Sequence, residues 1–218
     1  TTTYAKADLV FVVDMSGSMQ SNNKLTNAKK AINTMLDILK EKKVDAKYKM
    51  VTFSSSASIK NEKSGWVDSS TFSSWVEALN SPQGGTNYQA ALVKAQKAIS
   101  ANIRSDAEQI VLFVTDGEPT YHNEKNGIVS NEGTSTQGGG NWTKDTDYKG
   151  ALMGARALTG SDMFYSVGIG LNEVEKIYNG KTALNILEDV TNAVPNAQIK
   201  GAYNSQSTKL EELFSTLA

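Results

Sequence analysis

Hard oxygen donors gather in one short stretch near the start of the chain, Asp14-Met15-Ser16-Gly17-Ser18. It reads Asp-x-Ser-x-Ser, so a carboxylate and two hydroxyls alternate over five residues. Such oxygens suit Mg²⁺, Mn²⁺ or Ca²⁺, whereas Zn²⁺ and Cu²⁺ favour sites that contain His or Cys. The same residues could instead form an Asp turn and Ser caps before a helix. Alone, the stretch leaves both interpretations open.

A second set of oxygens stands in Gly84-Gly85-Thr86-Asn87, just before a helical pattern that runs from Tyr88 to Ile99. Thr86 offers a hydroxyl that could bind the same ion. Thr86 with Gln89 three residues later also fits a capping box, in which the two side chains satisfy backbone N–H groups at a helix start. The role of Thr86 therefore stays open between ion ligand and helix cap.

The third set is Thr115-Asp116-Gly117-Glu118, which follows the apolar run 110–114. Asp-Gly is a common hairpin turn, but Pro119 and a polar segment follow it here rather than an alternating strand. Asp116 thus repeats the situation of Asp14, which follows the apolar run 9–13. Continuous β-branched and aromatic runs are typical of strands buried on both faces of a parallel sheet. Ligands bind beyond the carboxyl ends of such strands, so we expect these oxygens to meet there.

Together the three stretches resemble the metal-ion-dependent adhesion site of von Willebrand factor type A domains, a family shared with the inserted domains of integrins. That site joins an Asp-x-Ser-x-Ser loop, a distant Thr and a more distant Asp, in the order found here, and the resemblance covers nearly all 218 residues. It implies a divalent cation, first of all Mg²⁺, with Mn²⁺ or Ca²⁺ as alternatives. It also implies that this ion captures an acidic residue of a protein ligand. The implied ligands are three hydroxyls and, directly or through water, two carboxylates: Ser16, Ser18, Thr86, Asp14 and Asp116.

Helical and strand patterns alternate along the chain. Helices are expected at 25–43, 72–79 (with Ser69 or Ser70 as the cap), 88–99, 148–158, 184–190 and 209–218, and strands at 9–13, 48–53, 57–60, 110–114, 163–168 and 197–203. This order predicts an α/β fold, with a doubly wound, mostly parallel sheet of about six strands and helices on both faces. The resemblance implies the Rossmann-like form of the type A domain.

We expect residues 1–218 to form a single domain with an insertion, the arm, at about 118–147. The arm is rich in Asn, Gly, Ser and Thr and shows no periodicity. A connection of this length is usually functional or disordered. Our hypothesis is that the arm lies beside the ion and contributes to partner choice; the alternative is a mobile decoration. Its only histidine, His122, is expected at the surface and is assigned no role.

Composition excludes several classes of protein. The net charge of −1 and the scattered Lys residues give no reason to expect a nucleic acid partner. No apolar run of about 18 residues is present, so direct membrane insertion is not expected. The absence of Cys excludes disulfides and thiolate catalysis, and it favours a bacterial surface protein over an animal extracellular one. The start at Thr1 is expected to be a cut within a larger chain.

The leading functional hypothesis is a binding module and not an enzyme. Type A domains without Cys and with a long arm resemble those at the tips of pili in Gram-positive bacteria. This resemblance implies an extracellular place on the bacterial surface or pilus, a wall anchor outside this sequence, host matrix or cell-surface proteins as partners, and a part in virulence. One alternative is an intracellular docking subunit of a chelatase-type assembly. Another is a metal-dependent phosphatase, but haloacid dehalogenase enzymes have an Asp where Ser16 stands.

Overall fold

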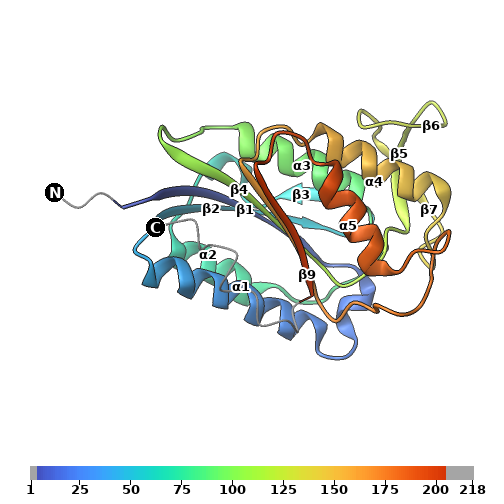
Figure 1. The fold of residues 1–218 in the computed structure, drawn as a ribbon, viewed down its shortest axis with the longest axis horizontal. Coiled ribbons are helices and arrows are strands. Elements are labelled where there is room, and N and C mark those ends of the chain that lie inside the picture. Colours follow the sequence, from blue (N-terminus) through green and yellow to red (C-terminus); the bar gives the residue numbers. More distant parts are fainter. Residues whose placement is uncertain (1–3, 205–218) are drawn as a thin grey trace.

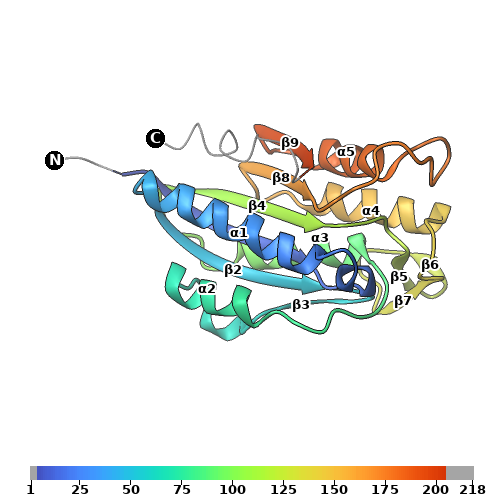
Figure 2. The same ribbon diagram turned by 90° about the horizontal axis from the view of Figure 1, so that it is seen from below.

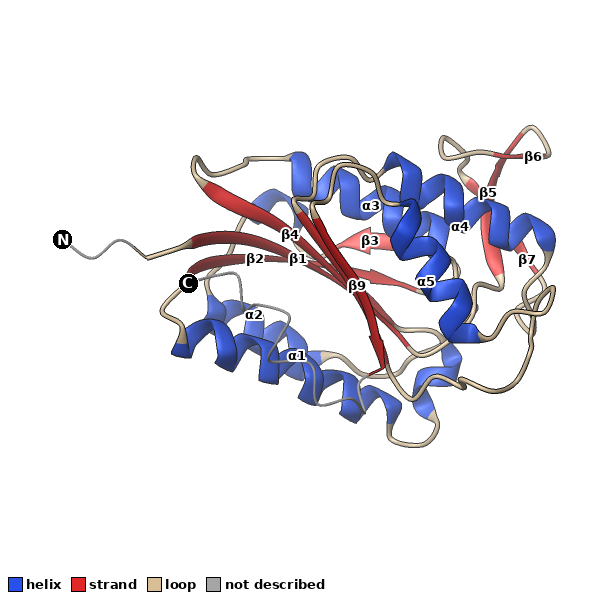
Figure 3. Ribbon diagram, viewed as in Figure 1, coloured by secondary structure: helices blue, strands red, loops and turns tan. Residues whose placement is uncertain are grey.

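The computed structural model describes residues 4–204, and in them a six-stranded sheet lies between two layers of helices (Figures 1 and 3). The helices are α1 (Lys24–Glu41), α2 (Ser69–Ala78), α3 (Tyr88–Ser100), α4 (Asp145–Ala157) and α5 (Ala183–Ala193). The strands are β1 (Lys6–Asp14), β2 (Asp45–Phe53), β3 (Ala57–Ile59), β4 (Ala107–Thr115), β5 (Tyr121–Lys125), β6 (Ile128–Val129), β7 (Ser135–Gly138), β8 (Met163–Gly168) and β9 (Ile199–Asn204). The central order is β3-β2-β1-β4-β8-β9, in which only β3 runs antiparallel to its neighbour. The predicted doubly wound α/β fold is confirmed.

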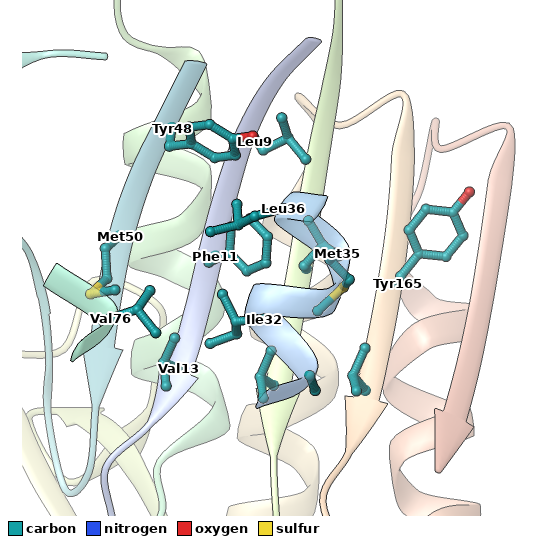
Figure 4. Packing of buried hydrophobic residues seen from close by; sticks show 14 of the residues in the cluster. Leu9, Phe11, Val13, Ile32, Met35, Leu36, Tyr48, Met50, Val76 and Tyr165 are labelled. Atoms are coloured by element: carbon teal, nitrogen blue, oxygen red, sulfur yellow. The ribbon is translucent and has the colours of Figure 1, made fainter. Parts of the chain in front are cut away.

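Strand β1 is buried on both faces, as its apolar run predicts. Leu9, Phe11 and Val13 point into the core formed with α1 and α2, where they pack against helix side chains of α1 (Figure 4). Val10 and Val12 point into the opposite core, formed with α3, α4 and α5. Each fully buried side chain of this size stabilises the fold by about 1.5–3 kcal/mol. The central strand is thereby fixed in position by both helical layers.

The position of β1 also creates the switch point of the sheet. It pairs with β2 on one side and with β4 on the other, both in parallel. The register places Val13 opposite Val114, so that the two strands finish side by side. The chain leaves β1 toward α1 on one face, while α3 lies on the other face (Figure 2). Ligand sites form where connections diverge in this way.

The start of α2 differs from the sequence prediction. Ser69 and Ser70 were the expected caps, but both lie within the helix, and the preceding Asp68 is the N-cap. Its side chain accepts a hydrogen bond of 2.9 Å from the backbone N–H of Thr71. Asp is among the preferred N-cap residues, and the polar run Asp68-Ser69-Ser70 contains three candidates in a row. Sequence alone therefore could not separate them.

The arm is more ordered than its sequence predicts. The segment contains three short strands that form a separate antiparallel sheet in the order β6-β5-β7, beyond the end at which the parallel strands finish (Figure 1). The prediction of an irregular segment was wrong, because strands of five, two and four mostly polar residues carry no apolar alternation. Strand pairing at this edge of the molecule is held by backbone hydrogen bonds rather than by a core.

The expectation that His122 lies at the surface was also wrong. Its side chain is buried, and its two ring nitrogens face carboxylates, with Nδ1 2.8 Å from Asp147 and Nε2 2.5 Å from Glu124. The contact with Asp147 joins β5 to the first turn of α4. Asn123 adds a second attachment, since its side chain accepts a 2.9 Å hydrogen bond from Asn87 at the start of α3. The arm is therefore tied to two helices at its base.

Two further expectations concern the closing helix and membrane insertion. The predicted closing helix, 209–218, lies outside the described residues. In the part of the chain from residue 4 to residue 204, no helix is both long enough and apolar enough to cross a bilayer.

Candidate metal centre

The loop after β1 holds Asp14 in a fixed orientation. One carboxylate oxygen accepts a 2.8 Å hydrogen bond from the backbone N–H of Ser16, and the other accepts one of 2.8 Å from the Thr115 hydroxyl on β4. Asp14 is fully buried. The Asp turn considered from the sequence is therefore present. The Ser cap is not, because Ser16 makes no side-chain capping bond to the short 3-10 helix Gly17–Gln20.

The two hydroxyls of the loop instead connect toward Asp116. The Ser16 and Ser18 hydroxyl oxygens lie 3.2 Å apart, and Ser18 donates a 3.1 Å hydrogen bond to one oxygen of Asp116. The other Asp116 oxygen lies 3.1 Å from the ammonium of Lys24. That contact is an ion pair without an aligned hydrogen bond, so this buried oxygen keeps unused acceptor capacity.

The question of whether Thr86 caps α3 has a clear answer. Asn87 is the N-cap, and its side chain accepts a 2.9 Å hydrogen bond from the backbone N–H of Ala90. The capping box of Thr86 with Gln89 was therefore a wrong alternative. Instead, the Gln89 side-chain oxygen accepts a hydrogen bond from the backbone of Asn123. Asn and Thr are both preferred N-cap residues, so the sequence offered two adjacent candidates and did not separate them.

The Thr86 loop and the Asp14 loop contact each other through two glycines. The carbonyl of Gly84 accepts a 2.9 Å hydrogen bond from the backbone N–H of Gly17. Gly84 has φ of +90°, a backbone conformation that side chains disfavour, and a Cβ there would meet the Ser55 hydroxyl at 3.2 Å. The backbone carbonyl of Thr86 in turn accepts hydrogen bonds from Thr120 and Tyr121. The loops after β1 and β4 thus both contact the segment before α3.

These loops surround a cavity of about 300 Å³. Ser18, Thr86 and Asp116 contribute to its wall, as do Lys24 and Glu118. The remaining wall comes from the arm and from the loop between β8 and α5, through residues that include Gly140, Asn141, Asn172 and Glu175. The cavity therefore joins the buried oxygens to the surface of the arm.

Two carboxyl groups at this site have raised pKa values. Burial, together with the nearby charge of Asp116, raises the pKa of Asp14 to about 7, although hydrogen bonds from Ser16 and Thr115 oppose the rise. Burial and the charge of Glu175 raise the pKa of Glu118 as well. Each shift means that the ionised carboxylate lacks sufficient positive charge around it. A bound cation would supply that charge.

The donor set fits a hard divalent cation. It consists of carboxylate and hydroxyl oxygens, the ligands that Mg²⁺, Mn²⁺ and Ca²⁺ accept. Within residues 4–204, no three His, Cys, Asp or Glu side chains gather in the manner of a metal cluster, and this site has two carboxylates. The hydroxyls would therefore be needed as ligands.

All five residues singled out from the sequence lie at this edge, and the contacts above link four of them, Asp14, Ser16, Ser18 and Asp116. Sequence reasoning missed Thr115, which orients Asp14, and Tyr88, whose hydroxyl lies 3.2 Å from that of Thr115. A polar residue at the end of an apolar run was the available signal for Thr115. It also missed Lys24, a cation at the first position of a helix.

Comparison with known proteins agrees with this fold. The sequence profile of the von Willebrand factor type A domain matches residues 9–118, half of the chain. The pilus adhesin SpaC from Lactobacillus rhamnosus GG has a similar fold, with a TM-score of 0.72 and 20% identity over 99% of this chain and 30% of that one. The PilB minor pilin from Streptococcus sanguinis has a TM-score of 0.68 and 16% identity over 99% of this chain and 61% of that one.

A third similar structure is proximal thread matrix protein 1 from the mussel byssus, described with a zinc-occupied MIDAS motif, the abbreviation for a metal-ion-dependent adhesion site. Its TM-score is 0.58, with 17% identity over 96% of this chain and 45% of that one. At these identities the likeness shows the fold alone. The chain spans 30% of the SpaC chain and 61% of the PilB chain. A search of curated proteins finds no match.

The raised pKa of Asp14 predicts how stability depends on pH. In chelating buffer, between about pH 4 and pH 7, the folded state keeps a proton on Asp14 that the unfolded state releases. The free energy of unfolding should therefore fall as pH rises through this window, by up to about 1.4 kcal/mol per pH unit. Urea unfolding at a series of pH values measures the slope.

Asp14→Asn is the matched variant, because it keeps the shape of the side chain and cannot ionise. Its slope should be shallower than that of the wild type between pH 5 and pH 7. Glu118→Gln measures how much of the pH dependence comes from Glu118, the second carboxyl group with a raised pKa. Equal slopes for the wild type and Asp14→Asn would contradict the burial of an unbalanced charge at Asp14.

Proposed function

The chain belongs to the von Willebrand factor type A domain family, and we propose that it is a binding module in which a divalent cation captures a carboxylate of a protein partner. The proposed metal ligands are Asp14, Ser16, Ser18, Thr86 and Asp116. One observation carries the proposal: two buried carboxylates at the ends of β1 and β4 share their edge of the sheet with hydroxyl oxygens, beside an open cavity.

Mg²⁺ is the proposed ion, with Mn²⁺ and Ca²⁺ as alternatives that the same oxygens accept. The charges of the two carboxylates about balance a divalent ion. Five protein groups leave a place for a sixth ligand, because Mg²⁺ prefers six. An Asp or Glu side chain of the partner, entering through the cavity, would supply it. Binding is proposed rather than catalysis, since Ser16 stands where a phosphatase of the haloacid dehalogenase type requires its second Asp.

The proposed setting is a larger adhesin on the surface or pilus of a Gram-positive bacterium, with residues 1–218 as one of its domains. Two of the similar structures belong to pilus proteins, and this chain spans only part of each. A host matrix or cell-surface protein is the proposed partner. The proposed arrangement anchors the whole chain to the cell wall through segments outside this sequence.

We propose that the arm takes part in partner choice. Gly140 and Asn141 of the arm lie in the cavity wall, and the next residue, Trp142, is 61% exposed. Val174 is 84% exposed and lies in the loop between β8 and α5, between the cavity-lining residues Asn172 and Glu175 in the sequence. Aromatic side chains are enriched in the cores of protein interfaces and among the residues that dominate binding energy, so Trp142 is the proposed main contact. The partner would then present an acidic residue with apolar neighbours.

Removing one proposed ligand should remove the stabilisation that the ion provides. At a concentration of Mg²⁺ one hundred times its dissociation constant, the native state should gain about 2.7 kcal/mol relative to chelating buffer. Ser16→Ala deletes a buried hydroxyl that contacts Asp14 and Ser18, and it should lose most of this gain. Thermal unfolding with Mg²⁺, Mn²⁺, Ca²⁺ and a chelator measures the difference.

Ser70→Ala is the control, because Ser70 is an exposed residue within the first turn of α2, away from the cavity. It should respond to Mg²⁺ as the wild type does. If the wild type shows no ion-dependent rise in midpoint at millimolar concentration, the proposed metal site is wrong.

Truncation of Trp142 should weaken partner binding without changing the affinity for the ion. Binding to a panel of immobilised matrix proteins is measured with Mg²⁺ and with a chelator, and a chelator-sensitive partner is chosen. Trp142→Ala should lower that affinity at least about tenfold, as expected for an exposed aromatic contact.

Ile128→Ala provides the matched control, since Ile128 is a 70% exposed apolar residue of the same arm outside the cavity wall. Its partner affinity should equal that of the wild type. If Trp142→Ala binds the partner with the affinity of the wild type, the proposed role of the arm in partner contact is wrong.

A further inference from the structure

Lys24 occupies an unusual place for a basic residue. It is the first residue of α1, and it follows Asn22 and Asn23, which have φ of 54° and 58°. These two left-handed residues turn the chain sharply into the helix, whose start lies at the same end of the sheet as the arm (Figures 1 and 2). The Lys24 side chain is part of the cavity wall and reaches Asp116.

Helix electrostatics disfavour a cation at this position. The N-terminus of a helix carries partial positive charge, which acidic residues stabilise and basic residues do not. The first turn of α1 contains no acidic residue to offset Lys24. The compensating charge comes from outside the helix, because the ammonium lies 3.1 Å from a fully buried oxygen of Asp116. A residue that breaks a local rule in this way is a candidate for a functional role.

The ion pair and the proposed metal site draw on the same carboxylate. One oxygen of Asp116 accepts a hydrogen bond from the Ser18 hydroxyl, and the other forms the ion pair with Lys24. The Lys24 side chain is 21% exposed and the Asp116 side chain is not exposed at all, so water screens their charges poorly. A divalent ion at Asp116 would meet the ammonium at close range, and two positive charges there repel each other. The single negative charge of Asp116 cannot balance both the divalent ion and the ammonium of Lys24.

We propose that Lys24 is a tethered cation that competes with the divalent ion for Asp116. The inference rests on the proposed function and assigns Lys24 a role as a positioning residue of that site. Without the ion, the ammonium balances Asp116 and stabilises the buried carboxylates. With the ion, it must leave Asp116 and lie elsewhere along the cavity wall. The strength of this ion pair therefore sets how tightly the site binds a divalent cation.

Lys24→Met tests the competition, because methionine keeps most of the aliphatic chain and removes the charge. Calorimetric titration with Mg²⁺ should show at least about tenfold tighter binding than in the wild type, since the ion no longer displaces an ammonium. In chelating buffer the same variant should unfold at a lower temperature, because Asp116 has lost its partner. Saturating Mg²⁺ should reduce or reverse that difference. Lys24→Gln serves the same purpose if the apolar variant fails to fold.

Lys30→Met is the matched control, since Lys30 is exposed on the same helix and the substitution removes the same charge. It should change neither the affinity for Mg²⁺ nor the midpoint in chelator. Affinity for Mg²⁺ in Lys24→Met that equals or falls below that of a binding-competent wild type would overturn the competition and leave the metal site standing. If the wild type and both Lys24 variants all fail to bind Mg²⁺, the proposed function fails and the competition fails with it.

Discussion

The repulsion between two buried carboxylates is the constraint on which this end of the molecule depends. Asp14 ends β1 and Asp116 follows β4, its neighbour in the sheet; burial, and next to it the charge of Asp116, raises the pKa of Asp14. Four neighbouring groups offset that unfavourable charge. Ser16 and Thr115 donate hydrogen bonds to Asp14, while Ser18 and Lys24 contact Asp116. Removing the charge of either carboxylate would relieve the repulsion between them.

The architecture explains why the two carboxylates meet. Buried on both faces, β1 has little freedom to slide, and its parallel register with β4 makes both strands end at the same level. Connections that diverge from these ends leave an opening, which the segment before α3 and the arm surround. Attachment of the arm through His122 and Asn123 places its cavity-lining residues beside the carboxylates. The same contacts that order the arm therefore shape the entrance to the site.

Much of this arrangement could be predicted from the sequence, for identifiable reasons. The apolar runs before Asp14 and Asp116 are continuous and rich in β-branched and aromatic residues, so they predicted two buried strands and the edge of the sheet at which both strands end. Features that depend on one hydrogen bond did not, such as the choice of Asn87 rather than Thr86 as the cap of α3. The strands of the arm were not predicted because their residues are mostly polar. The burial of His122 was not predicted because it depends on Asp147, 25 residues away. The ion pair of Lys24 with Asp116 is likewise a tertiary contact between residues far apart in the chain.

Anomalous X-ray scattering from crystals grown with Mn²⁺ would test the cation site most directly, because it locates the metal independently of stability and of any partner. Our interpretation predicts one strong peak within metal–oxygen bonding distance of the Ser16 and Ser18 hydroxyls, between the carboxylates of Asp14 and Asp116, and facing the cavity beside Thr86. Full-occupancy Mn²⁺ at another place, or no peak in this cavity, would contradict it.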